Sequence, residues 1–218
     1  MTDKRSLRAA AAAARAAMPA SDREAARRAI RAAVLRRCQQ LRVPVGARVA
    51  CYQPLRTEPG SVELLTELHA AGYQVIVPHT LPDLDLDWLP WNPASDPARN
   101  PASAPAWKPG GQPSTPAGPA SQPAEGSSAA LGPAAIGTAH LVLVPAFAVD
   151  RAGRRLGRGG GSYDRALARV PTGTVVAALL FTGELIDRVP TDPWDRPVTA
   201  VVSPDGWQEL PATGRGNA

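Results

Sequence analysis

The sequence lacks the features that define extracellular and membrane proteins. Cys38 and Cys51 are the two cysteines in 218 residues, so neither a disulfide framework nor a CxxC metal or redox motif can form. The longest apolar stretches, such as residues 141–149 and 175–181, fall well short of the roughly 18 residues that a membrane span requires. These absences favour a soluble cytoplasmic protein with no membrane partner.

Aromatic residues are also few, at 5% of the chain, and acidic residues are outnumbered, with 24 Lys/Arg against 19 Asp/Glu. The excess belongs to residues 1–37, which hold ten Lys/Arg and three Asp/Glu. This segment has no apolar core of a signal peptide, and its helical pattern continues into the rest of the chain. The tryptophans lie near expected loops, so base stacking along a basic groove is not indicated, and we expect no nucleic-acid partner.

Alternating helix and strand signals predict the fold class. The run of Ala, Leu and Arg over residues 3–17 indicates a helix, and Ser21 with Glu24 resembles a capping box that opens a second helix ending near Leu41. Further strands are predicted at residues 47–52, 73–78, 141–145, 174–181 and 198–202, with helices at 62–71 and 164–170. We therefore expect residues 1–218 to form a single three-layer α/β/α domain with a mostly parallel sheet and an N-terminal helical pair.

Proline is concentrated in one segment. Residues 92–135 contain ten of the 24 prolines, and Ala, Gly and Ser make up most of the remainder. Such a composition has too few large apolar residues to form a core and predicts a flexible insert within the domain, with a proline-rich recognition element as the alternative.

The strongest chemical signal is the segment 150–165, DRAGRRLGRGGGSYDR, with five glycines and five arginines. It follows a predicted buried strand and precedes a helix, where ligands of α/β proteins usually bind. Glycines let backbone amides approach an anion and arginines supply charge, so the pattern favours phosphate binding over a mobile surface loop. Neither the P-loop nor the complete GxGxxG pattern is present. Arg158 lies at the centre of the loop and is the candidate catalytic cation.

Taken together, these motifs resemble the 5-formyltetrahydrofolate cyclo-ligase (methenyltetrahydrofolate synthetase) family. The matching segments are KRSLR at residues 4–8, YQPLRTEPGSVELL around Glu58, RLGRGGGSYD at 155–164 and PWDRPVTAVVS around Asp195. The agreement follows chain order over nearly the whole sequence except residues 92–135. Ser162 stands where the family usually has a tyrosine, and Gly160 where some members have lysine.

The resemblance implies an enzyme that uses ATP and Mg²⁺ to cyclise 5-formyltetrahydrofolate to 5,10-methenyltetrahydrofolate, releasing ADP and phosphate. It assigns Gln53, Glu58 and Tyr163 to the folate substrate, and Asp164 and Asp195 to Mg²⁺, a hard cation suited to oxygen ligands. It assigns to ATP the residues Lys4, Arg5, Ser6, Leu7, Arg8, Arg155, Leu156, Gly157, Arg158, Gly159, Gly160, Gly161, Ser162 and Tyr163.

Two other functions stay open on sequence alone. One is a nucleic-acid-binding module that uses the basic N-terminal helix, for which a solvated basic face is the plainer interpretation. The other is a nucleotide- or folate-binding relative that has lost turnover, because Ser162 replaces an aromatic residue. We favour the enzyme, acting as a monomer.

Overall fold

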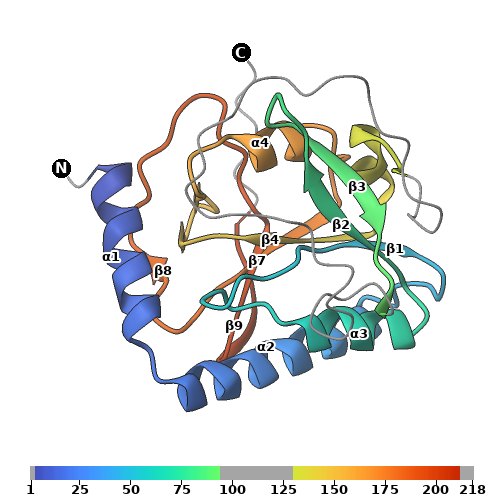
Figure 1. The fold of residues 1–218 in the computed structure, drawn as a ribbon, viewed down its shortest axis with the longest axis horizontal. Coiled ribbons are helices and arrows are strands. Elements are labelled where there is room, and N and C mark those ends of the chain that lie inside the picture. The colour runs from blue at the N-terminus through green and yellow to red at the C-terminus, as the bar shows by residue number, and fades with distance from the viewer. Residues whose placement is uncertain (1–2, 94–129, 212–218) are drawn as a thin grey trace, which may run out of the picture.

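The computed structural model describes residues 3–93 and 130–211, and its centre is a seven-stranded sheet (Figure 1). The strand order is β10-β9-β7-β4-β1-β2-β3, and the five inner strands run parallel. A three-stranded sheet, β6-β5-β8, lies beside it. The expected α/β class with a mostly parallel sheet and an N-terminal helical pair is confirmed.

The helices are α1 (Lys4–Ala17), α2 (Ala20–Gln40), α3 (Val62–Ala70), the 3-10 helix η3 (Pro133–Thr138) and α4 (Ser162–Leu167). The strands are β1 (Arg48–Ala50), β2 (Gln74–Thr80), β3 (Leu86–Pro90), β4 (Leu141–Pro145), β5 (Ala148–Asp150), β6 (Arg155–Leu156), β7 (Val175–Leu179), β8 (Leu185–Ile186), β9 (Ala200–Ser203) and β10 (Gly206–Glu209).

The two long N-terminal helices begin in different ways. Asp3 caps α1, because its side chain accepts a hydrogen bond from the Ser6 amide, as expected for an N-cap aspartate. The predicted capping box of α2 is wrong. The N-cap of α2 is Pro19, which makes no side-chain hydrogen bond, so the fixed backbone angle of proline rather than a Ser21 hydroxyl marks this helix start.

Two apolar clusters cover the two faces of the main sheet. Residues of α2 and α3, including Val34 and Leu65, pack on one face, and residues of η3 and α4, including Ile136 and Leu167, pack on the other. Figure 1 shows α2 and α3 below the sheet and α4 above it. Burying apolar surface on both faces produces the expected three layers.

Each edge strand of the main sheet runs antiparallel to its neighbour, and neither was predicted from the sequence. β3 pairs with β2, and β10 pairs with β9. Their sequences, LDWLP and GWQE, are short and of mixed composition, and short edge strands are typical of sheets that must not recruit another strand. Short strands with mixed composition give a weak periodic signal.

The proline-rich insert was expected to end at residue 135, but η3 begins before that residue. Pro133 to Ala135 belong to η3, and Ala135 is buried on the sheet. Leu131 already donates a backbone hydrogen bond to Trp88 of β3. Residues 94–129, which make up most of the expected insert, lie outside the described residues. Across 3–93 and 130–211, no helix combines the length and apolar character needed to cross a membrane.

An ion pair ties the β3 edge to the segment after α4. Arg169 donates to both carboxylate oxygens of Asp85, at 2.9 and 2.5 Å. This hydrogen bonding, together with the backbone amide of Leu86, holds the pKa of Asp85 below its ordinary value of 3.8. A carboxyl group with a lowered folded-state pKa stabilises the fold above its unfolded pKa and loses that contribution as the pH falls through the folded pKa.

We expect Asp85→Asn to lower the free energy of unfolding at pH 7, and the difference from the wild type to shrink below about pH 4 as the wild-type carboxyl protonates. Urea denaturation at both pH values measures this. The exposed Asp187 provides the control variant Asp187→Asn. A wild-type to Asp85→Asn difference that stays constant over this range would contradict the assigned ion pair.

Candidate active site

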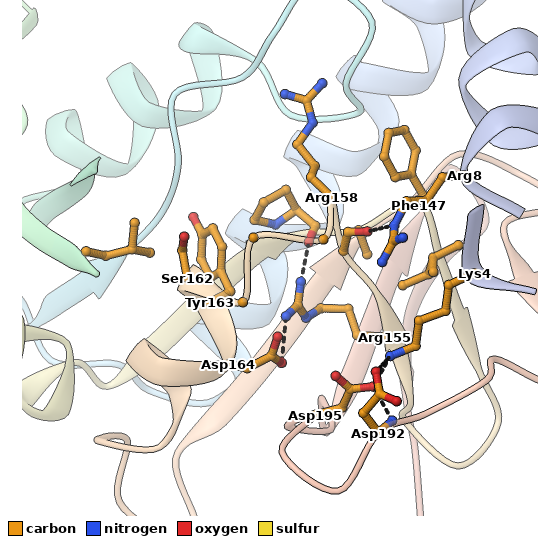
Figure 2. A pocket seen from close by; sticks show the side chains of 18 of the residues that line it. Lys4, Arg8, Phe147, Arg155, Arg158, Ser162, Tyr163, Asp164, Asp192 and Asp195 are labelled. Atoms are coloured by element: carbon orange, nitrogen blue, oxygen red, sulfur yellow. Dashed lines mark hydrogen bonds and ion pairs between the residues drawn. The ribbon is translucent and has the colours of Figure 1, made fainter. Parts of the chain in front are cut away.

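A cavity of about 450 Å³ opens at the carboxyl ends of β2 and β4. Its wall combines one flank of α1, the loop between β6 and α4, the turn around Phe147, and the segment 192–195 (Figure 2). These elements are far apart in sequence and meet because parallel strands end at the same sheet edge. This is the position at which α/β sheets bind ligands.

The glycine-rich loop takes conformations that need glycine. Gly159 and Gly161 have φ values of 106° and 70°, and Gly161 is the N-cap of α4. A Cβ at Gly157 would lie 2.6 Å from a guanidinium nitrogen of Arg155. Side chains at these positions would strain the backbone or displace Arg155, so the loop passes close to the buried arginine.

Two basic residues of α1 reach the cavity from one helix face. The Nε of Arg8 donates to the Gly157 carbonyl at 2.8 Å. The Lys4 ammonium lies 2.6 Å from a carboxylate oxygen of both Asp192 and Asp195. Burial acts to lower the pKa of Lys4, but the hydrogen bonds to the two aspartates outweigh it and the pKa is raised. Lys4 is therefore a cation throughout the neutral range.

Arg155 forms the floor of the cavity. Its side chain is 4% exposed, and it donates to Asp164 at 2.9 Å and, at 3.4 Å, to the Pro145 carbonyl. Its guanidinium also lies over the Tyr163 ring. Asp164 additionally accepts the backbone amide of Arg196. A buried arginine held by a carboxylate and a carbonyl is a fixed positive charge beneath the loop.

Glu58 and Tyr163 also line the cavity. Glu58 is 7% exposed and lines the cavity, although it comes from the loop after β1. The Tyr163 hydroxyl is buried and has no hydrogen-bond partner among the described residues. Burial raises the pKa of Tyr163 well above 10, so the hydroxyl is an available donor.

Several predicted site residues do not line the cavity. Arg5 and Ser6 are exposed, and Leu7 packs under the small sheet instead. Gln53 is exposed and contributes nothing to the cavity wall. Arg5, Ser6 and Leu7 lie away from the cavity because residues between positions 4 and 8 of a helix point to other faces than these two. The other predicted residues reach it: Lys4, Arg8, Glu58, Arg155, Leu156, Gly157, Arg158, Gly159, Gly160, Gly161, Ser162, Tyr163, Asp164 and Asp195.

Several residues line the cavity that were not predicted from the sequence, among them Arg15, Phe147, Asp192 and Trp194. Arg15 is 4% exposed and binds Glu184 through two hydrogen bonds of 2.6 and 2.8 Å. Its guanidinium also lies over Phe147, and Arg158 approaches the same ring. Arg15 lies on the same face of α1 as Lys4 and Arg8, and this helical spacing is the signal in the sequence that could have predicted it.

Asp164 and Asp195 have the chemistry of a Mg²⁺ site but also have internal partners. Both carboxylates line the cavity, and Asp195 already faces a cation, Lys4. Residues 3–93 and 130–211 contain no group of three or more His, Cys, Asp or Glu that could hold a metal ion. Mg²⁺ commonly binds one or two carboxylates and completes its shell with water and phosphate oxygens, so this donor set fits.

The fold and cavity define the class: an α/β protein with a cavity lined by cations and glycines at the carboxyl edge of a parallel sheet. The profile of the 5-formyltetrahydrofolate cyclo-ligase family matches residues 1–204. The chain belongs to this family and is an enzyme of that class.

Individual relatives of the chain carry the same family name. The chain is 35% identical over 164 residues to the 5-formyltetrahydrofolate cyclo-ligase of Mycolicibacterium smegmatis, covering 73% of this chain and 74% of the relative. Over 65 residues it is 37% identical to the Escherichia coli K12 enzyme, covering 29% of this chain and 36% of the relative.

Two solved structures share the fold. The 5,10-methenyltetrahydrofolate synthetase of Mycoplasma pneumoniae has a TM-score of 0.68 at 16% identity, covering 93% of this chain and 99% of the other. That of Aquifex aeolicus has a TM-score of 0.64 at 23% identity, covering 99% and 96%.

Removing the Arg15 side chain should leave the largely buried Glu184 carboxylate, which is 13% exposed, without its cation and with only the Phe181 amide as a partner among the described residues. We expect Arg15→Met to lower the free energy of unfolding by about 3 kcal/mol, the usual cost of breaking a buried pair from one side. Urea denaturation measures this. The control is Arg31→Met, which breaks the more exposed Arg31–Glu67 pair and should cost at most about 1 kcal/mol. Equal losses in the two variants would contradict a buried Arg15–Glu184 pair.

Proposed function

We propose that this enzyme cyclises 5-formyltetrahydrofolate to 5,10-methenyltetrahydrofolate at the expense of ATP, with Mg²⁺, and releases ADP and phosphate. One observation supports this best. The basic face of α1, the glycine-rich loop and three aspartates converge on the same cavity, which is also lined by the buried Glu58 and by Tyr163, whose hydroxyl has no hydrogen-bond partner among the described residues.

The proposed chemistry needs charge neutralisation more than a nucleophile. A formamide oxygen is a poor leaving group, so the oxygen first takes the γ-phosphoryl group of ATP, and ADP leaves. The folate N10 then attacks the formyl carbon and a C–N bond forms. N10 loses its proton, the C–O bond breaks, and phosphate leaves carrying that proton. Cations and backbone amides lower the barrier to such phosphoryl transfer by offsetting the charge that develops.

In this proposal the position of each cation in the cavity determines its role. Lys4 and Arg8 bind the phosphates of ATP from the α1 side, and Arg155 supplies a fixed charge below them. Gly157 to Gly161 bring backbone amides close to the transferring group. Mg²⁺, bound through Asp164 and Asp195 when present, would offset charge on the phosphates. Glu58 and Tyr163 orient the folate by accepting and donating hydrogen bonds.

The alternative of a nucleic-acid-binding helix is less well supported, because the arginines of the N-terminal helices are largely engaged within the protein. Arg15 and Arg23 are buried, and Arg31 and Arg37 pair with Glu67 and Glu209. A nucleic-acid surface requires a row of free cations that release counterions from phosphates.

A direct assay tests the proposal. Purified protein with ATP, Mg²⁺ and 5-formyltetrahydrofolate should produce the near-ultraviolet absorbance of the methenyl product. Omitting ATP, or chelating Mg²⁺ with EDTA, should abolish the signal. Tight binding of ATP or folate without any product would instead support a relative that has lost turnover.

Arg158 is the proposed catalytic cation. It lines the cavity, its guanidinium approaches Phe147, and no carboxylate of the described residues pairs with it (Figure 2). We expect Arg158→Ala to lower kcat about 100-fold, as for other preorganised transition-state donors, and Arg158→Lys to recover only part of it.

The steady-state kinetics of Arg151→Ala provide the control, because Arg151 is an exposed arginine of the same segment outside the cavity. A near-normal kcat and KM for ATP in Arg158→Ala would remove Arg158 from the catalytic machinery.

A further inference from the structure

Arg27 of α2 is not part of the cavity wall, yet it holds the loop that brings Glu58 there. Its Nε donates to the Glu58 carbonyl at 3.1 Å, and its Nη2 approaches the same carbonyl at 2.9 Å. Nη2 also lies 2.9 Å from the Arg56 carbonyl and 3.3 Å from that of Leu55. Three carbonyls of one turn thus converge on one guanidinium group.

Apart from Arg27, two hydrogen bonds within the turn itself set its shape. Residues 51–61 connect β1 to α3 without forming helix or strand. The Glu58 amide donates to the Leu55 carbonyl at 2.9 Å, and the Leu55 amide donates to the Glu58 carboxylate, also at 2.9 Å. The direction of the Glu58 side chain therefore depends on the geometry of its own turn, whose remaining carbonyl groups need donors.

Arginine suits this place better than lysine. The Arg27 side chain is 16% exposed, and burial lowers its pKa, but a guanidinium stays charged in proteins. Its planar array of donors serves several carbonyls at once, whereas an ammonium on a flexible stem does not match that geometry. Its acidic neighbour Glu24 is half-exposed and 3.9 Å away, so the carbonyl groups are its main partners.

We propose that Arg27 is a positioning residue for the folate side of the cavity. By binding the carbonyl groups of residues 55, 56 and 58, it fixes the turn that directs the Glu58 carboxylate toward the substrate. This rests on the proposed function, because it assigns the Glu58 side of the cavity to folate. ATP, which the proposal places at the opposite side, should be unaffected.

The kinetic test compares Arg27→Gln with Arg31→Gln. Arg31 lies about one turn further along α2 and pairs with Glu67 of α3, so its variant removes a similar charge from the same helix. We expect Arg27→Gln to raise the KM for 5-formyltetrahydrofolate about tenfold while the KM for ATP changes less than about twofold, because small misplacements of substrate contacts are costly. Arg31→Gln should change neither, and Arg27→Lys should recover only part of the loss.

Hydrogen exchange supplies a readout that does not need turnover. The amides of Leu55 and Glu58 should exchange at least about tenfold faster in Arg27→Gln than in the wild type, and remain protected in Arg31→Gln. Unchanged exchange, or an equal rise in both KM values, would overturn the positioning role. An inactive wild type would overturn the proposed function instead, and the exchange measurement would still decide whether Arg27 holds the turn.

Discussion

The docking of α1 against the carboxyl edge of the sheet is the contact on which the proposed active site depends. Three basic residues on one face of the helix each bind a distant part of the chain. Arg8 binds Gly157 across 149 residues, Lys4 binds Asp195 across 191, and Arg15 binds Glu184 across 169. These contacts place the helix so that its cations line a cavity built mainly by the rest of the fold.

Charge in the cavity is balanced with a small excess of cations. The described lining contains five Lys or Arg side chains and four Asp or Glu side chains, leaving one net positive charge. Most of these groups have a protein partner, as desolvated charges must. A polyphosphate entering this cavity meets cations whose positions are already fixed, which reduces the reorganisation that binding and transition-state stabilisation require.

Residue patterns predicted the parts of the fold in which local signals are strong. The Ala- and Arg-rich α1, the β1-α3-β2 unit and the buried strand β4 were all visible as composition or periodicity. The strands of the small sheet were not, because β6 and β8 have two residues each and pairing, rather than local sequence, defines them.

The cavity was only partly predictable for the same reason. The glycine-rich loop could be recognised from its composition, and the family resemblance supplied Glu58, Asp164 and Asp195. Arg15 was missed because its one local signal, a position on the helix face of Lys4 and Arg8, is weak, and its partner Glu184 lies 169 residues away in sequence. The resemblance also assigned Gln53 to the folate, but its side chain is exposed and does not line the cavity. Tertiary packing decides which residues of a motif reach a site.

The most direct test of this account is hydrogen exchange of the whole protein with and without ATP and Mg²⁺. If α1 and the glycine-rich loop form one phosphate site, nucleotide should slow exchange in residues 4–17 and 157–163 together, over the same ATP concentration range. Protection of the loop without any change in α1 would contradict the claim that the docked helix is part of the active site.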